Sequence, residues 1–265
     1  MDSFDLELTI ESGQTPTFTW EKTAPQRFRR IAGKDEVWLG KGRLGGCLKS
    51  SPTFSRASVR RLFRLQDDVS AIYADLAEDD AVLAEAVRRF AGLRLTESDP
   101  WESTVCFLVS QNNNIPRIKQ IVRGLHVRPD GLNPASGGIM RPEKLVHADV
   151  SALKMGYREA FLKQTARLVA ENGFSFERLR RRGLDEARDA LMELPGVGPK
   201  VADCILLYGL GRTEAFPQDV WVKKAVATWY GVTKENNVKE FAAEKWGNNA
   251  GYAQQLLFCH AREQL

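Results

Sequence analysis

The sequence predicts a mainly α-helical α+β fold that begins with a small antiparallel β-sheet. Two observations lead to this expectation. Apolar and polar residues alternate in short runs over residues 1–57, whereas beyond that point apolar residues recur at the spacing of a helix face. The length of 265 residues suffices for one large domain or two. We therefore expect an N-terminal β domain over residues 1–57 and a helical core over residues 58–265.

The expected strands lie close together in the sequence, separated by Gly- and Lys-rich turns. In residues 4–10 every second side chain is apolar, as in a strand with one buried face. Similar short runs cover residues 18–21, 27–32 and 36–39. Strands joined by short turns pair in antiparallel fashion, so these runs predict one small antiparallel sheet.

The helical core divides at residues with cap and turn chemistry. Asp99 precedes Pro100 and begins one helix, which ends at the polar stretch 111–114. Residues 127–143 are rich in Pro and Gly and predict a long exposed loop. The expected helices cover residues 58–90 with interruptions, 99–110, 115–125, 158–172, 184–194, 199–210, 220–230 and 250–263.

The most informative segment is a hairpin that reads LPGVGPK and starts at Leu194. Pro195 fixes one φ angle, while Gly196 and Gly198 permit left-handed turns and close approach of another backbone. Pro199 suits the first turn of the helix that follows. Backbone N–H groups at such a helix start can bind phosphate oxygens.

Lys200 and Asp219 are the candidate catalytic pair. Lys200 lies at a helix start, where the positive end of the helix dipole disfavours the charged ammonium. A neutral amine can act as a nucleophile and form a Schiff base. Asp219 precedes the next helix, so its carboxylate can cap that helix and face Lys200. Taken singly, each residue is more commonly a solvated lysine or an ordinary cap, but the hairpin between two helices favours function.

Composition excludes several classes of protein. The net charge of +4 permits a basic face without establishing one. The four cysteines form no close pair and have no His cluster beside them, which argues against a zinc or iron–sulfur site. Cys204 has no basic neighbour that would activate it and is expected to be a packing thiol. We expect an intracellular protein, because no apolar run approaches a membrane span and the start lacks a signal-peptide layout.

Residues 194–221 resemble the helix-hairpin-helix and Gly/Pro–Asp signature of base-excision DNA glycosylases, whose bifunctional glycosylase/lyase members carry the lysine. Other segments resemble 8-oxoguanine DNA glycosylases of the type with an extra N-terminal domain: SGQ at 12–14 with FTW at 18–20, SQNNNIPRI at 110–118, GYR at 156–158, and GYAQ at 251–254 with Phe258. The resemblance is collinear from about residue 4 to the C-terminus. It implies two helical subdomains in the core, a helix-hairpin-helix near residues 188–210, and a lesion pocket in the cleft between the subdomains.

The resemblance also implies a role for each site residue. Lys200 would be the nucleophile, and Asp219 would stabilise charge on the sugar. The flipped lesion would contact the carbonyl of Gly13 and the side chains of Cys204, Gln254 and Phe258. Asn112, Arg117 and Arg158 would contact the orphaned cytosine, with Tyr157 as a wedge between bases. The hairpin residues expected on a DNA phosphate are Gly196, Val197, Gly198 and Lys200.

The expected function is therefore removal of 8-oxoguanine, preferably opposite cytosine, from duplex DNA, with strand cleavage through a lysine Schiff base. One alternative is a helix-hairpin-helix glycosylase for another lesion. The other is a non-catalytic DNA-binding module, which the presence of both Lys200 and Asp219 disfavours because gripping phosphates needs neither. No metal and no cofactor are expected, with a monovalent cation at the hairpin left open. The expected partner is double-stranded DNA that contains 8-oxoguanine. We expect the protein to be a monomer that does not bind membranes and that is associated with DNA in the cytoplasm, nucleoid or nucleus.

Overall fold

The structure is a computed structural model that describes residues 4–32, 35–41, 48–50, 55–126, 138–171 and 173–265. It is mainly helical with one small antiparallel sheet, as the sequence predicts. No helix among these residues is long and apolar enough to cross a membrane. Most of the expected loop over 127–143, namely residues 127–137, lies outside the described residues.

The chain begins with two short helices, so the strands expected over residues 4–10 and 18–21 were wrong. Helix α1 is Leu6–Glu11 and α2 is Thr15–Thr19. Leu6 and Ile10 are both buried, and their spacing of four fits a helix as well as a strand. The Asp5 side chain decides between them by accepting a hydrogen bond from the Leu8 amide at 2.9 Å, as a helix N-cap does.

The sheet follows directly, with its strands in sequence order. Its strands are β1 (Glu21–Ala24), β2 (Arg27–Ala32), β3 (Asp35–Lys41) and β4 (Leu48–Ser50). The strands expected over 27–32 and 36–39 are confirmed as β2 and β3, whereas β4 was not anticipated. Phe28 pairs with Leu39 across β2 and β3, and both side chains are buried. They form an N-terminal core with α1, Trp20 and the next helix, α3 (Arg56–Leu62).

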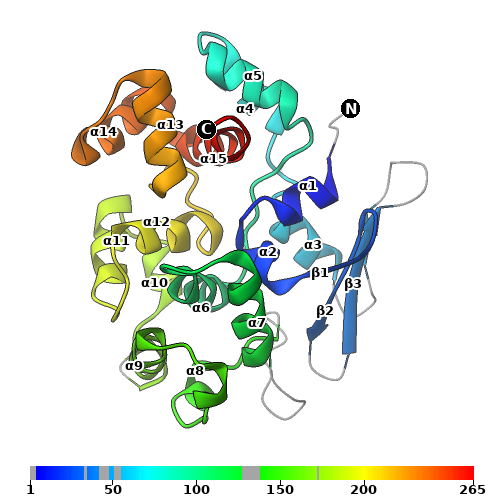
Figure 1. Cartoon of the computed structure of the whole chain (residues 1–265), viewed down its shortest axis with the longest axis vertical. Helices are drawn as coiled ribbons and strands as arrows, with labels where there is room; N and C mark the ends of the chain where they lie inside the picture. The colour runs from blue at the N-terminus through cyan, green and yellow to red at the C-terminus, as the bar shows by residue number, and fades with distance from the viewer. Residues whose placement is uncertain (1–3, 33–34, 42–47, 51–54, 127–137, 172) are drawn as a thin grey trace.

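The packing of α3 bears on the domain organisation. Val59 and Leu62 of α3 lie in the same core as the sheet, whereas the following helices belong to a second, larger core. The division into residues 1–57 and 58–265 stays a prediction. The sheet lies at one side of the molecule, beside α2 and α7 (Ile115–Leu125) (Figure 1).

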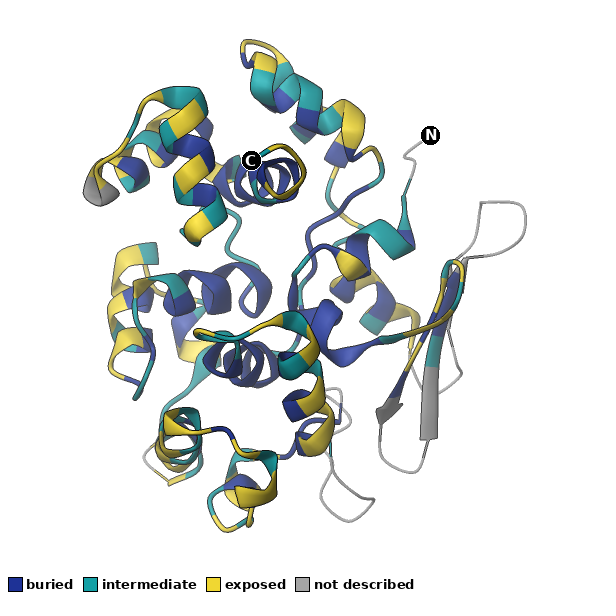
Figure 2. Ribbon diagram, in the orientation of Figure 1, coloured by how far each residue is buried: buried dark blue, intermediate teal, exposed yellow. Residues whose placement is uncertain are grey.

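Helix α6 (Pro100–Ser110) is at the centre of the larger core. Asp99 caps it, as expected, by accepting hydrogen bonds from the amides of Trp101 and Glu102 at 2.9 and 3.1 Å. Residues 100–109 are all buried, and α6 packs against α2, α7, α9 (Tyr157–Glu171) and α12 (Pro199–Tyr208). Figure 2 shows α2, α6, α12 and α15 (Ala250–Gln264) as largely buried helices.

The remaining helices complete two groups, which confirms the predicted helical core. In Figure 1, one group at the top surrounds α15 and the other, below it, surrounds α6. The upper group contains α4 (Val69–Ala77), α5 (Ala81–Arg89), α13 (Val220–Tyr230) and α14 (Glu235–Trp246). The lower group also contains α8 (Pro142–Leu145), α10 (Phe176–Leu179) and α11 (Leu184–Met192), and short 3-10 turns cover Ser151–Leu153 and Gly247–Asn249.

A buried ion pair joins α11 to α12. Arg188 Nε lies 2.6 Å from Asp203 Oδ1, and both side chains are almost fully buried. Burial raises the pKa of Asp203, and the Arg188 guanidinium opposes that shift. The pair therefore fixes α12 against α11 only while both charges are present.

We expect Arg188→Met to destabilise the protein by about 3–5 kcal/mol, because it leaves the Asp203 carboxylate buried without its partner. Chemical denaturation monitored by circular dichroism measures this loss. The double variant Arg188→Met, Asp203→Leu should recover most of the stability, since two apolar side chains leave no unpaired charge. A double variant as unstable as the single one would show that the loss of stability does not come from the unpaired Asp203 carboxylate.

Candidate active site

A cleft of about 920 Å³ lies between the two helical groups. It is lined by the end of α6 and the following loop, the start of α12, residues 217–221 and α15, with Gly13 and Phe18 on the N-terminal side. Eight of the sequence-predicted residues line this cleft: Gly13, Asn112, Gly198, Lys200, Cys204, Asp219, Gln254 and Phe258. The structure thus brings together both members of the candidate catalytic pair and the whole set expected around a lesion.

Lys200 and Asp219 lie at the starts of two successive helices, α12 and α13. Lys200 follows Pro199 in the first turn of α12, and its Nζ lies 5.1 Å from the centre of the Phe107 ring. Asp219 is the N-cap of α13, where its Oδ1 accepts hydrogen bonds from the amides of Trp221 and Val222 at 3.0 and 2.8 Å. The predicted capping position of Asp219 is therefore confirmed.

Burial governs the protonation of the acidic groups in the cleft. It raises the pKa of Asp219, and the hydrogen bond from Val222 and the charge of Lys200 oppose that shift. It also raises the pKa of the Cys204 thiol to about 11, against the opposing charge of Lys200. Cys204 is accordingly a protonated thiol near neutral pH, which agrees with the expected packing role.

Gly13 and Phe258 form one wall of the cleft. Gly13 has a φ of +85°, and a Cβ atom there would lie 2.8 Å from Cε1 of Phe258. Its amide donates to the Thr17 hydroxyl at 2.8 Å, which holds the turn in place. The aromatic ring therefore packs directly on a bare stretch of backbone, as expected for two residues that would contact one base.

The floor of the cleft contains two residues that our reading of the sequence missed. The Tyr208 hydroxyl lies 3.1 Å from Gln254 Oε1 and 2.7 Å from Oε1 of the neighbouring Gln255. Tyr208, Cys204 and Lys200 follow one another at intervals of four along α12, and this shared face was the signal available in the sequence. Gln255 offered no comparable signal beyond its position next to Gln254.

The hairpin differs in part from the expectation. Gly196 has a φ of +80°, and a Cβ there would lie 2.5 Å from the Phe161 ring of α9, so glycine is required. Gly198 has an extended φ of −90° with open space around it, so it is not a left-handed position. Val197 donates its N–H to the Leu194 carbonyl at 3.0 Å, which removes that donor from phosphate binding.

Three hairpin amides remain available for an anion. Within the described ranges, the N–H groups of Gly196, Gly198 and Lys200 have no hydrogen-bond partner, and those of Gly198 and Lys200 lie at the positive end of α12. The carbonyls of Pro195 and Gly196 already accept hydrogen bonds from Thr165 and Gln111, both at 3.1 Å. The monovalent cation considered for the hairpin stays a prediction.

Of the expected wedge and opposite-base residues, Asn112 lines the mouth of the cleft and Tyr157 and Arg158 hydrogen-bond to it, whereas Arg117 does not line the cleft. Tyr157 is 48% exposed, and its hydroxyl accepts a hydrogen bond from Asn112 Nδ2 at 3.2 Å. Arg158 donates to the carbonyls of Gln111 and Asn112 at 2.7 and 2.8 Å. Arg117 donates to the carbonyls of residues 153 and 154. Arg158 thus braces the backbone around Asn112, whose φ of +45° is unusual for a residue other than glycine, whereas Arg117 braces residues 153 and 154.

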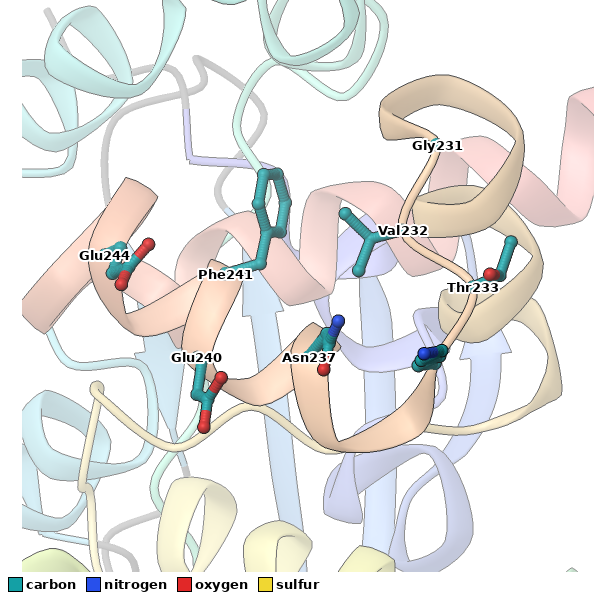
Figure 3. A pocket seen from close by; sticks show the side chains of 8 residues that line it. Gly231, Val232, Thr233, Asn237, Glu240, Phe241 and Glu244 are labelled. Atoms are coloured by element: carbon teal, nitrogen blue, oxygen red, sulfur yellow. The ribbon is translucent and has the colours of Figure 1, made fainter.

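A second cavity, beside α14, fits a DNA phosphate less well. Figure 3 shows an open pocket of about 380 Å³ beside α14, lined by residues 231–234, 237, 240, 241 and 244. Its charged lining includes the carboxylates of Glu240 and Glu244, which disfavour a phosphate. In the part of the chain that the structure describes, no cluster of His, Cys, Asp and Glu could hold a metal ion.

We expect Gly196→Ala to lower the unfolding midpoint, because alanine costs about 1–3 kcal/mol in a left-handed conformation and its methyl group would also displace Phe161. Gly198→Ala is the matched control, since its φ suits alanine and its surroundings are open. Thermal unfolding of the two variants distinguishes them. Equal midpoints would show that the hairpin tolerates a side chain at both positions.

Comparison with known proteins identifies the family. Residues 1–104 match the model of the 8-oxoguanine DNA glycosylase N-terminal domain, and residues 181–208 match the helix-hairpin-helix motif. A probable N-glycosylase/DNA lyase of Methanothermobacter thermautotrophicus is 30% identical over 98% of this chain and 94% of its own length. The N-glycosylase/DNA lyase OGG1 of Arabidopsis thaliana is 32% identical over 96% of this chain and 76% of its own length.

Solved structures agree over the whole fold. The Clostridium acetobutylicum 8-oxoguanine glycosylase/lyase, bound to double-stranded DNA with cytosine opposite 8-oxoguanine, has a TM-score of 0.86 and 28% identity over 100% of this chain and 93% of its own. MBOgg1, bound to a low-affinity DNA ligand, has a TM-score of 0.86 and 32% identity over 100% of this chain and 94% of its own. This chain belongs to the N-glycosylase/DNA lyase family of 8-oxoguanine DNA glycosylases.

Proposed function

We propose that this protein is a bifunctional base-excision enzyme that removes 8-oxoguanine from duplex DNA and then cleaves the strand as an AP lyase. The observation that carries the proposal is the meeting of Lys200 and Asp219 in one cleft that also contains Gly13, Gln254 and Phe258. Relatives named as glycosylase/lyases over nearly the full chain support it. The solved relative that holds cytosine opposite 8-oxoguanine supports the substrate.

The lesion must leave the duplex to reach these groups. In the cleft, the flipped base stacks on Phe258, with Cys204 on its other face and Gln254 at its Watson–Crick edge. The Gly13 carbonyl accepts the N7–H that 8-oxoguanine carries and guanine lacks. A backbone carbonyl held by the turn at Gly13 suits this distinction, because it can accept a hydrogen bond but cannot donate one.

The chemistry needs a neutral amine and an ionised carboxylate. The Lys200 amine attacks C1′ as the bond from C1′ to the base breaks and the departing base takes up a proton. Asp219 stabilises the positive charge that develops on the sugar and accepts a proton from the lysine. The bond from C1′ to the ring oxygen then breaks, the oxygen leaves as the protonated C4′ hydroxyl, and the ring-opened sugar is held as a Schiff base on Lys200. Removal of a C2′ proton expels the 3′ phosphate and breaks the strand.

The mouth of the cleft supplies the contacts to the opposite strand. Asn112 enters the space that the base vacates, and Tyr157 separates the neighbouring bases. Cytosine offers O2 and N3 as acceptors, which match guanidinium donors. Arg158 uses one N–H on each of its nitrogens for carbonyls of the protein, so both of its Nη atoms keep a further N–H for the cytosine. Gly198 and Lys200 amides bind a phosphate of the damaged strand.

Borohydride trapping on an 8-oxoguanine duplex tests the proposal. Wild-type protein should form a covalent complex, and Lys200→Gln should bind the duplex without forming one, because its carboxamide cannot make a reducible Schiff base. Lys223→Gln is the control, since Lys223 lines the same cleft. A Lys200→Gln variant that is trapped as well as wild type would identify another amine as the nucleophile. Trapping only on a duplex with a different lesion would favour the alternative glycosylase.

Asp219→Asn should slow single-turnover excision by roughly ten- to a thousandfold, the range for one lost acid–base or electrostatic group. Its unfolding midpoint should stay close to wild type, because asparagine caps a helix about as well as aspartate. The pH profile gives a second check. Asp219 acts when it is ionised, and burial raises its pKa. On acidification, wild-type activity should therefore begin to fall at a pH above about 3.9, the pKa of free aspartate. Asp219→Asn should not show this acidic decrease in activity. An unchanged rate would reduce Asp219 to a cap.

Wild-type protein should excise 8-oxoguanine faster opposite cytosine than opposite adenine, by roughly five- to a hundredfold. Adenine presents an N6 donor to arginines that already donate, which leaves buried groups unpaired. Arg158→Ala should shrink this ratio more than it weakens binding to undamaged DNA. Arg178→Ala removes an equal charge from exposed α10 and should leave the ratio unchanged. Equal wild-type rates on the two duplexes would contradict this reading of the opposite base.

A further inference from the structure

A chain of polar side chains runs along the floor of the cleft and ends at Gln254. Tyr208, Gln254 and Gln255 are only 4%, 4% and 2% exposed, so each needs its hydrogen bonds from the protein. The Tyr208 ring stacks on Phe107 with centroids 5.5 Å apart. Burial raises the pKa of the Tyr208 hydroxyl well above its usual range, so the hydroxyl carries its proton.

The orientation of Gln255 is fixed at its far end. Its Nε2 donates to the Ser12 carbonyl at 2.9 Å, and a backbone carbonyl can only accept. The carboxamide oxygen of Gln255 must therefore face Tyr208, which it does at 2.7 Å. Ser12 immediately precedes Gly13, so this series of hydrogen-bonded side chains begins beside the Gly13 carbonyl, which is expected to contact the lesion.

A count of protons then decides the orientation of Gln254. The Tyr208 hydroxyl has a single proton and can donate only one hydrogen bond. It donates that bond to Gln255 Oε1, because this contact is the shorter one and the Gln255 carboxamide cannot turn. The contact of 3.1 Å between Tyr208 Oη and Gln254 Oε1 would then join two acceptors with no proton between them. A half-turn of the Gln254 carboxamide exchanges its nitrogen and oxygen, and such exchanges are assigned from the hydrogen-bond network. Gln254 Nε2 has no other partner within the described ranges, so the half-turn gives it one.

We propose that Tyr208 and Gln255 are positioning residues that hold Gln254 with its carboxamide oxygen toward the flipped base. The proposal rests on the function proposed above and names a determinant of its specificity. Gln254 Nε2 then donates to the Tyr208 hydroxyl, which donates to Gln255 Oε1, and Gln255 Nε2 donates to the Ser12 carbonyl and to Cys259 Sγ. The oxygen left at the cleft end accepts from the N1–H and the amino group of 8-oxoguanine.

This orientation of the Gln254 carboxamide distinguishes two oxidised purines that the Gly13 carbonyl cannot distinguish. 8-Oxoadenine carries the same N7–H as 8-oxoguanine, so a carbonyl that reads N7–H accepts both. At the Watson–Crick edge, however, adenine has an unprotonated N1, which would face the Gln254 oxygen as a second acceptor. Gln254 rejects 8-oxoadenine only as long as its carboxamide cannot turn to offer Nε2 instead.

The test compares single-turnover excision of 8-oxoguanine and 8-oxoadenine, each opposite cytosine. In Gln255→Leu the Tyr208 hydroxyl donates its hydrogen bond to the Gln254 oxygen instead, which fixes the carboxamide in the opposite orientation. The ratio of the two rates should therefore fall by about five- to a hundredfold. In Tyr208→Phe the ring still stacks on Phe107, but the carboxamide is free to turn, so the ratio should fall by a smaller factor. The double variant should resemble Tyr208→Phe, because no hydroxyl then imposes the wrong orientation.

Tyr73→Phe is the matched control, since it removes another buried tyrosine hydroxyl, which donates to the Leu93 carbonyl at 2.9 Å. It should leave the ratio at the wild-type value. Ratios that are unchanged in both Gln255→Leu and Tyr208→Phe, or variants that slow both lesions equally, would overturn the proposal while leaving the proposed function intact. A wild-type protein that excises neither lesion would instead overturn the proposed function, and this inference with it.

Discussion

The placement of α12 is the constraint on which the candidate site depends, and the buried ion pair between Arg188 and Asp203 fixes it on one side. On another side, Gly196 lets the hairpin approach Phe161 of α9 more closely than any side chain would allow. The helix then presents Lys200, Cys204 and Tyr208 along one face to the cleft. A rotation of α12 by one residue would move all of them, because a helix turns by about 100° per residue.

Burial raises the pKa of every acidic group in the cleft, and this determines which of them can be ionised near neutral pH. It raises the pKa of the Cys204 thiol to about 11 and holds the Tyr208 phenol protonated. It also raises the pKa of Asp219, although two backbone N–H groups and Lys200 favour the carboxylate. The thiol and the phenol therefore serve as packing and hydrogen-bonding groups, while Asp219 is the acid whose charge can respond to the lysine beside it.

The sequence was informative wherever a local interaction decides the structure. Asp99 with Pro100 predicted the start of α6, and the period over 115–125 matched α7 residue for residue. The strand predicted over residues 4–10 was wrong because apolar residues two apart are also four apart, which fits one face of a helix. The Asp5 cap then favoured the helix over the strand. The sequence could not distinguish Gly196 from Gly198, since only the distant Phe161 ring makes one essential. Tyr208 and Gln255 were missed for the same reason, because their partners lie on other elements.

The central claim is that Lys200 is the amine that bonds to the sugar, and peptide mapping tests it most directly. Wild-type protein is incubated with an 8-oxoguanine duplex, reduced with borohydride and digested, and the modified peptide is sequenced by mass spectrometry. The account predicts a single adduct, the base-free sugar, on the Lys200 side chain. An adduct on Lys223 or Lys239, which also line the cleft, would contradict it.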